Sequence, residues 1–193
     1  MVSQQMSRIE KAFEQKIRTL EDSLNRILVI HYACESFLDV EKGSPTIVSI
    51  AVKDLFSGQV TTFALCDYES EESMLKAYLQ FLNDNRDHLF VHWNMNDSVY
   101  GFKAIENRYL QITGEHGTTI PNDQLFDLDD LVEKKYGKHY APHPKLYNLA
   151  NINRYSTLGL RSGKDEAQLF KQGAFFENKL STIIRFDRPF LTA

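Results

Sequence analysis

Acidic side chains follow two apolar segments of this sequence and lie at the start of a late helical segment, where they could bind divalent cations. Glu35 comes shortly after the run ILVIHY, and Asp97 follows the run HLFVHW. Asp165 and Glu166 come just after Gly163, at an expected helix start. Carboxylate oxygens suit Mg²⁺ and Mn²⁺, and phosphate-transfer sites often hold two such ions about 4 Å apart. Glu35 and Asp97 are therefore candidate metal ligands.

Each of these acids also has a structural interpretation. Glu35 could be an ordinary surface acid at a strand end. Asp97 could be the N-cap of a following helix, because Asp accepts hydrogen bonds from the first free N–H groups. Asp165 and Glu166 could stabilise the positive end of a helix dipole without taking part in any reaction. The structural and the functional interpretations can hold together.

Four β-branched or apolar runs predict the strands that would position these acids. They are residues 27–32, 46–54, 59–65 and 88–93. Helices are expected at 70–86 and 99–114, and a strand and helix or a helix at 125–137, followed by mostly helical segments. Three strands, a helix, a strand and then mostly helices predict an α/β domain with a mixed central sheet flanked by helices.

Residues 1–26 predict a separate N-terminal amphipathic helix ahead of the domain at 27–193. Its apolar stripe has three- and four-residue spacing. The stripe consists of Ile9, Phe13, Ile17, Leu20 and Leu24. Two interpretations are open. The stripe could bind a second copy of the chain or another protein, or it could pack on its own domain.

The order of these segments resembles the DEDD 3′–5′ exonuclease superfamily, whose fold is RNase H-like. The run VIHYACESF, followed by SPTIVSIAVKD and TTFAL, is similar to the superfamily's opening hairpin, where the first strand ends in Asp-x-Glu. Glu35 matches the second acid, and Ala33 stands where the first Asp belongs. HWNMNDSVYGF is similar to the second motif, with Asn94 and Asp97 matching and the spacer one residue short. The resemblance covers residues 27–180.

The third motif of the superfamily matches least well. It has a His or Tyr four or five residues before a final Asp on a late helix. Asp165 or Glu166 could supply the acid, but Tyr155 and His143 have the wrong spacing, so no general base is identified. Asp127 falls where the superfamily has a structural Asp.

The resemblance implies two-metal phosphodiester hydrolysis with Mg²⁺ or Mn²⁺ on DNA or RNA, with Asn94 contacting the nucleic acid or orienting a water. Alanine cannot bind a cation, so Ala33 implies impaired or absent cleavage, whether it arose by divergence or by engineering. Ala33→Asp is expected to raise metal affinity with little change to the fold. An inactive pseudonuclease that binds nucleic acid or protein is the alternative. A third hypothesis is an unrelated α/β binding domain.

A stretch rich in lysine and tyrosine, residues 133–147, adds candidates for nucleic-acid binding. Lys134 and Lys138 could contact phosphates, and Tyr140 could stack on a base. The alternative is a solvated helix end with buried tyrosines. Trp93 lies on an apolar strand, which predicts a core residue rather than a stacking surface.

Composition narrows the remaining classes. The net charge of −4 means that any nucleic-acid binding must use a local basic patch. The two cysteines, Cys34 and Cys66, cannot form a disulfide framework, which is typical of a reduced cytoplasmic protein. No segment approaches the roughly 18 apolar residues of a membrane span, and the acids and amides at the N-terminus argue against a signal peptide.

Overall fold

The computed structural model describes residues 7–36, 38–40, 43–96 and 100–184. Five strands form one mixed sheet in the order β3-β2-β1-β4-β5. The strands are β1 (Ile27–Cys34), β2 (Ile47–Asp54), β3 (Val60–Ala64), β4 (Leu89–His92) and β5 (Leu125–Asp127). β1, β2 and β3 pair antiparallel, whereas β4 is parallel to both β1 and β5. This is the sheet of an RNase H-like fold, so the predicted fold class is confirmed.

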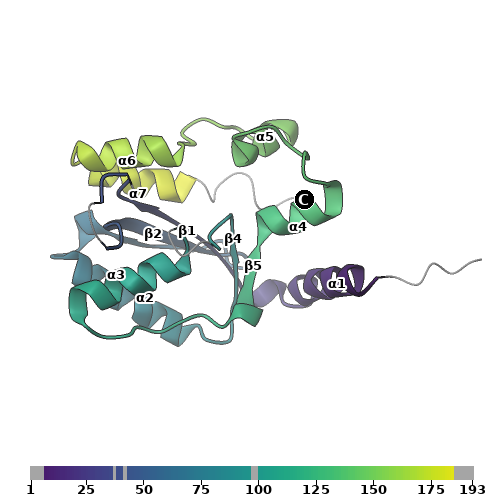
Figure 1. Ribbon diagram of the computed structural model, residues 1–193, viewed down its shortest axis with the longest axis horizontal. Helices are drawn as coiled ribbons and strands as arrows, with labels where there is room; N and C mark the ends of the chain where they lie inside the picture. Colours follow the sequence, from purple (N-terminus) through teal and green to yellow (C-terminus); the bar gives the residue numbers. More distant parts are fainter. Residues whose placement is uncertain (1–6, 37, 41–42, 97–99, 185–193) are drawn as a thin grey trace, which may run out of the picture.

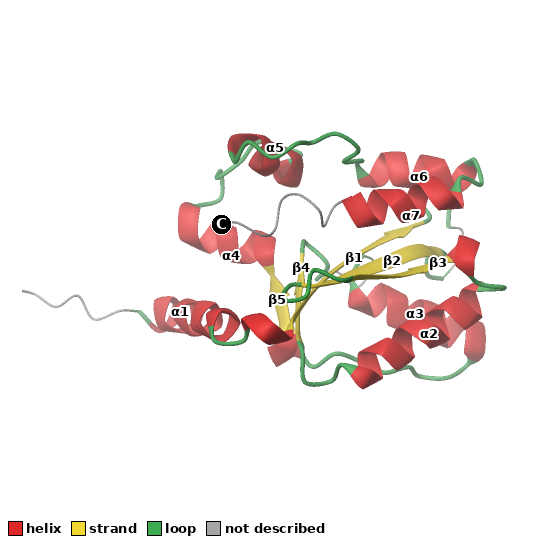
Figure 2. Ribbon diagram, turned by 180° about the vertical axis from the view of Figure 1, so that it is seen from behind, coloured by secondary structure: helices red, strands yellow, loops and turns green. Residues whose placement is uncertain are grey.

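Helices cover both faces of the sheet, as Figures 1 and 2 show. One face carries α2 (Glu71–Asp84) and α3 (Phe102–Thr113), and the other carries α6 (Gly163–Lys171) and α7 (Phe175–Ile184). α4 (Leu128–Tyr136) and α5 (Lys145–Ile152) lie beyond the β5 edge. Among the described helices, none combines the length and apolar character needed to cross a membrane.

The apolar runs that predicted the strands are explained by burial on both faces. Every residue of β1 is buried. Leu28, Ile30 and Tyr32 belong to the larger core on the α2–α3 side, while Ile27 and Val29 belong to a smaller cluster on the other face. A strand covered by helices on both faces needs apolar side chains at successive positions rather than at alternate ones.

The helix ends follow the sequence signals at α2 but not at the start of α3. Ser70 caps α2 through a capping box, and Gly114 ends α3 with a left-handed φ of 76°. The N-cap of α3 is Gly101, so the interpretation of Asp97 as its N-cap is wrong. Asp97 itself lies outside the described residues. The chain first makes an isolated bridge between Asn96 and Gly101, which delays the helix.

The N-terminal helix α1 (Arg8–Glu21) begins at a capping box formed by Ser7 and Glu10. Its central stripe residues Phe13, Ile17 and Leu20 pack on the smaller apolar cluster of the same domain. Ile9 and Leu24 are 75% and 55% exposed. The stripe therefore packs mostly on its own domain, and a partner bound through residues 1–26 stays a prediction.

Candidate functional site

A cleft opens at the edge of the sheet where β1 and β4 end. Because these two strands are parallel, their carboxyl ends meet at the same edge. In the sheet, β2 lies on one side of β1, whereas β5 lies on the opposite side of β4. The strand order therefore reverses between β1 and β4. Open α/β sheets bind ligands in the crevice at such a reversal. The cleft has a volume of about 770 Å³ and is lined by residues 31–36, Trp93, Asn94 and side chains of α6.

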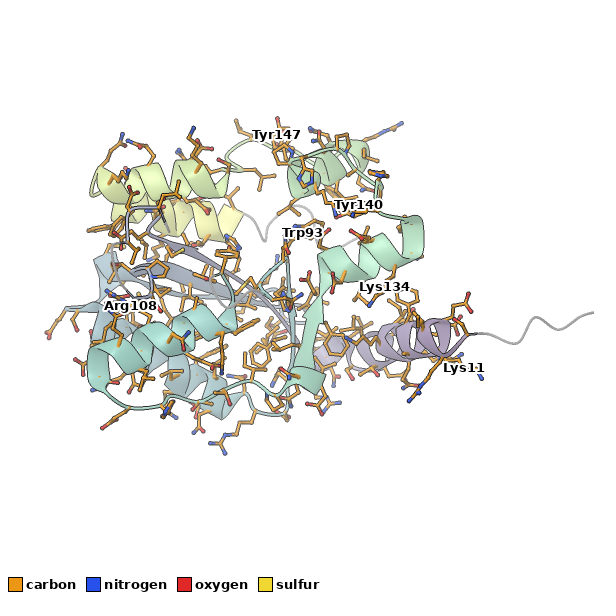
Figure 3. All side chains as sticks on the ribbon, viewed as in Figure 1. Lys11, Trp93, Arg108, Lys134, Tyr140 and Tyr147 are labelled. Carbon is orange, nitrogen blue, oxygen red and sulfur yellow. The ribbon has the colours of Figure 1, made fainter. Side chains whose placement is uncertain are left out.

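A second lobe of about 490 Å³ adjoins the first. Residues 143–147, at the start of α5, form one wall, and residues 160–163, leading into α6, form another. The two lobes share Trp93, Asn94 and Gly163. Figure 3 shows Trp93 beyond the strand ends, between α6 and the α4–α5 region. The cleft is therefore one groove with Trp93 at its junction.

Ala33 and Glu35, the residues matched to Asp-x-Glu, both line the first lobe. Ala33 is only 2% exposed, and the cost of burying a carboxyl group argues against the expectation that Asp would fit there with little change to the fold. The Glu35 carboxylate accepts hydrogen bonds from the Thr46 N–H at 3.2 Å and the Thr46 hydroxyl at 2.9 Å. Arg108 donates to the same hydroxyl at 3.3 Å and pairs with Glu71 at 2.6 Å. Glu35 is thus held in a network that ties β2 to α2 and α3.

The two candidate acids of α6 have different surroundings. Asp165 is exposed at the second lobe and accepts hydrogen bonds from the Ser162 hydroxyl at 2.7 Å and N–H at 3.0 Å. These bonds lower the pKa of Asp165, as expected for a capping-box residue. Glu166 is 3% exposed and lines the first lobe. It accepts a hydrogen bond from the Ser181 hydroxyl at 2.7 Å, and its other oxygen lies 3.8 Å from His31 Nε2.

Glu166 belongs to a buried polar layer between the sheet and the α6–α7 pair. The Ser49 hydroxyl of β2 donates to the Asn178 carbonyl at 3.4 Å and lies 3.3 Å from the Thr182 hydroxyl. Ser49, Asn178, Ser181 and Thr182 are all buried. The helices that form one wall of the cleft are therefore joined to the sheet partly by hydrogen bonds rather than by apolar packing alone.

Asp127 fixes the turn that follows β4. Its Oδ1 accepts from the Asn94 N–H at 3.0 Å and the Asp129 N–H at 2.9 Å, and its Oδ2 accepts from the Asn96 amide at 2.5 Å. Burial raises the pKa of Asp127, while the hydrogen bonds from the two backbone N–H groups oppose that change. Asn94 takes a left-handed φ of 55°, and its exposed side chain lines both lobes. The residue matched to a structural Asp thus positions Trp93 and Asn94.

The three candidates of the lysine- and tyrosine-rich stretch, Lys134, Lys138 and Tyr140, do not line the cleft, although Lys145 and Tyr147 of the same stretch line its second lobe. Lys134 lines a separate depression of about 300 Å³ between α4 and α1, and Lys138 is exposed after α4 ends. The Tyr140 hydroxyl donates to the Asp129 carboxylate. Lys145 lies 4.8 Å from the centre of the Tyr140 ring and bonds to Asp129 at 3.2 Å. Tyr140 therefore has protein partners on its hydroxyl and on its ring.

The described donors alone do not make a site for a pair of divalent ions. Within the part of the chain that the structure describes, no three His, Cys, Asp or Glu side chains gather closely enough to hold a metal ion. Ala33 offers no side-chain donor, and the carboxylates of Glu35 and Glu166 are hydrogen-bonded to neighbouring hydroxyls. The pairing of Glu35 with Asp97 stays a prediction, because Asp97 lies outside the described residues.

Comparison with known protein families gives no matching family model, and no curated protein matches the sequence. Among solved structures, the chain is similar to the EXO domain of Nibbler from Aedes aegypti. The TM-score is 0.42 and the sequence identity is 12%, over 89% of this chain and 84% of that chain. The candidate site therefore rests on the geometry of this chain's own residues.

Two residues of the cleft were missed by the sequence interpretation. Trp93, expected in the core, is half-buried and lies just after β4 rather than within it. Lys164 is exposed at the rim of the first lobe and has no ion-pair partner among the described residues. The signal that could have placed Trp93 at the cleft was its position directly after a short strand and before Asn94. Nothing local distinguished Lys164 from other surface lysines.

Proposed function

We propose that this domain binds nucleic acid in the two-lobed cleft without hydrolysing it, and so acts as a pseudonuclease. The observation that carries the proposal is the position of the cleft at the strand-order reversal, with two lining carboxylates, Glu35 and Glu166, that are hydrogen-bonded to protein groups. The cleft lies where an open α/β sheet binds its ligand. Its described acids are used to hold the fold together.

Cations at the cleft support a polyanionic ligand. Lys164 lies at the rim of the first lobe and has no ion-pair partner among the described residues. Arg161 lines the second lobe. Lys171 also lines the first lobe and pairs with Asp39 at 2.9 Å. Phosphate binding through such cations releases counterions and falls with salt. Because the chain has a net charge of −4, these local cations must provide the attraction.

Binding can be measured by fluorescence anisotropy with labelled single-stranded DNA and RNA of about 12 nucleotides, a length suited to a single domain. The buffer should contain a chelator, since the proposal requires no metal ion. We expect Lys164→Ala to weaken binding about fivefold, the upper end for one exposed charge pair, and to reduce the salt slope by about one. Lys11→Ala is the matched control, because Lys11 is exposed on α1, far from the cleft in Figure 3.

Hydrolysis is the competing outcome, and it would use Glu35 and Asp97 as ligands of Mg²⁺ or Mn²⁺ with an acid from α6. End-labelled strands incubated with either ion and separated on a gel should show no shortening. Metal-dependent shortening that is lost in both Glu35→Gln and Glu166→Gln would contradict the pseudonuclease proposal and favour an exonuclease. Absence of binding by every strand, in chelator or in metal, would contradict both.

A further inference from the structure

A pocket beneath the segment that joins α3 to β5 lies at the opposite edge of the sheet from the cleft. The cleft is at the carboxyl ends of β1 and β4, whereas this loop pocket is lined by Arg86 and Gln124, which come just before β4 and β5 begin. We infer that the loop pocket binds a small aromatic carboxylate with a body of about two rings and a hydroxyl group at its far end.

The body of the loop pocket is apolar and has a volume of about 310 Å³. Leu82, Phe90, Ile120 and Pro121 form its apolar wall. An apolar cavity of about 150 Å³ holds one benzene ring, so this volume suits a body of about two rings. Such a body would bury its faces against these side chains and leave water, which favours binding.

The roof of the loop pocket is held in place by packing. It is formed by residues 115–121, an irregular segment that passes along α2 on its way to β5 (Figures 1 and 2). A Cβ at Gly117 would lie 2.5 Å from a methyl group of Leu79 and 3.3 Å from the ring of Tyr109, so only glycine lets the segment approach α2 and α3 this closely. The pocket is therefore already shaped before a ligand arrives.

A small inner pocket continues the loop pocket toward the core. The two share Leu82, Thr118 and Ile120, and the inner one adds Tyr78 and Glu106. Its volume of about 10 Å³ is close to the space that one water molecule needs. A single oxygen atom of a ligand would therefore fill it.

The Tyr78 hydroxyl gives the inner pocket its chemistry. Tyr78 is 1% exposed, and its hydroxyl has no hydrogen-bond partner among the described residues. Burial raises the pKa of Tyr78, and the Glu106 carboxylate raises it further, so that carboxylate lies near the hydroxyl. A buried polar group without a partner is costly, and a ligand that supplies the partner removes that cost. A ligand hydroxyl can accept from the Tyr78 O–H and donate to the Glu106 carboxylate.

Arg86 gives the loop pocket its charge. The side chain is exposed, lines the pocket and has no ion-pair partner in the part of the chain that the structure describes. Its guanidinium donates to the Asn83 side-chain oxygen, and its backbone carbonyl accepts from the Gln124 amide at 2.7 Å. A guanidinium presents its N–H groups in a plane that matches the two oxygens of a carboxylate. The outer end of the ligand is therefore an anion.

The probe for this site is 6-hydroxy-2-naphthoate, which carries the two polar groups at opposite ends of a two-ring body. Its relative 2-naphthoate lacks the hydroxyl, and 2-naphthol lacks the carboxylate. Titrations followed by amide NMR of the nitrogen-labelled chain give both the affinity and the place of binding. We expect the amide signals of Leu82, Thr118 and Ile120 to shift. Shifts confined to residues of the cleft, or no shifts at all, would overturn the inference.

Two variants test the polar contacts separately. Arg86→Gln should weaken both carboxylates about fivefold, the upper end for one exposed charge pair, and leave 2-naphthol unchanged. Tyr78→Phe should remove a roughly 2- to 12-fold preference for 6-hydroxy-2-naphthoate over 2-naphthoate, the contribution of one neutral hydrogen bond. This variant loses only a hydroxyl without a partner, so it should fold as stably as the wild type.

A third variant tests the place of binding. Thr118→Trp fills the pocket and should abolish binding of all three compounds. His116→Trp is the matched control, because it adds the same bulk to the same segment at an exposed position that lines neither pocket. Equal binding by these two variants would contradict the assignment to the loop pocket. If Thr118→Trp does not fold, Arg86→Gln and Tyr78→Phe still decide. Equal affinity of the wild type for 2-naphthol and 6-hydroxy-2-naphthoate would contradict the requirement for an anion.

Discussion

Replacing Asp127 should show how strongly the fold and the cleft are joined. Asp127 is 7% exposed, and its carboxylate caps α4 while holding the turn after β4. Asp127→Ala removes the cap and the acceptor for Asn94 and Asn96 together. Asp127→Asn keeps one carbonyl oxygen, which can take the place of Oδ1 and accept from the N–H groups of Asn94 and Asp129.

The size of each effect follows from these contacts. Loss of an N-cap costs about 1 kcal/mol, and each hydrogen bond to a charged acceptor contributes about 1.5–3 kcal/mol. Burial of the carboxylate offsets part of this, so we expect Asp127→Ala to lower the free energy of unfolding by about 3 kcal/mol. Asp127→Asn loses only the Asn96 contact and should cost about 1–2 kcal/mol.

Urea denaturation followed by circular dichroism and by Trp93 emission gives these free energies. Equal losses in the Asn and Ala variants would refute the assignment of the main contacts to Oδ1. The pH dependence is a second check. Burial places the pKa of Asp127 above its ordinary value of 3.8, so the folded chain takes up the proton first and is stabilised by it. The free energy of unfolding of the wild type should therefore rise relative to Asp127→Asn as the pH falls through the folded-state pKa toward 3.8.

Three further changes test other parts of the molecule. Ala33→Asp places a carboxyl group at a buried position and should lower the free energy of unfolding by about 2–3 kcal/mol. Titration calorimetry of this variant should detect tighter Mn²⁺ binding, but gels of end-labelled strands should show no cleavage. Arg108→Ala breaks a largely buried pair with Glu71 and should cost about 2–3 kcal/mol in urea, whereas an unchanged midpoint would contradict its clamping role. Lys134→Ala with Lys138→Ala should leave anisotropy-measured affinity unchanged, because both lysines lie outside the cleft, and a weakened complex would restore the lysine- and tyrosine-rich stretch as a binding surface.

The strands were predictable because burial on both faces leaves a local signal. β1 and β2 each contain a continuous apolar run, and such a run needs no knowledge of its neighbours. The start of α3 was not predictable in the same way. It depends on Asn94 entering the left-handed region and on the bridge between Asn96 and Gly101, and both are set by contacts with the distant Asp127.

The candidate acids could be found from the sequence, but their surroundings could not. Glu35 was chosen by its place in a motif, whereas its partner Thr46 comes from the next strand, and Arg108 from a helix much later in the chain. Asp165 and Glu166 are adjacent, so the motif did not separate them. The helix turns one toward the second lobe and buries the other against β1, which only packing decides.

The hydrogen-bonded layer beneath α6 and α7 has a consequence for local unfolding. Separating apolar surfaces exposes them to water at a cost that grows with area, whereas water can replace the hydrogen bonds of hydroxyl groups such as those of Ser49 and Thr182. The α6–α7 pair should therefore separate from the sheet more readily than α2 and α3, which cover the larger apolar core. Amide hydrogens of α6 and α7 should then exchange with solvent earlier than those of α2 and α3. Because α6 forms part of the cleft wall, a bound strand should slow that exchange in proportion to its occupancy.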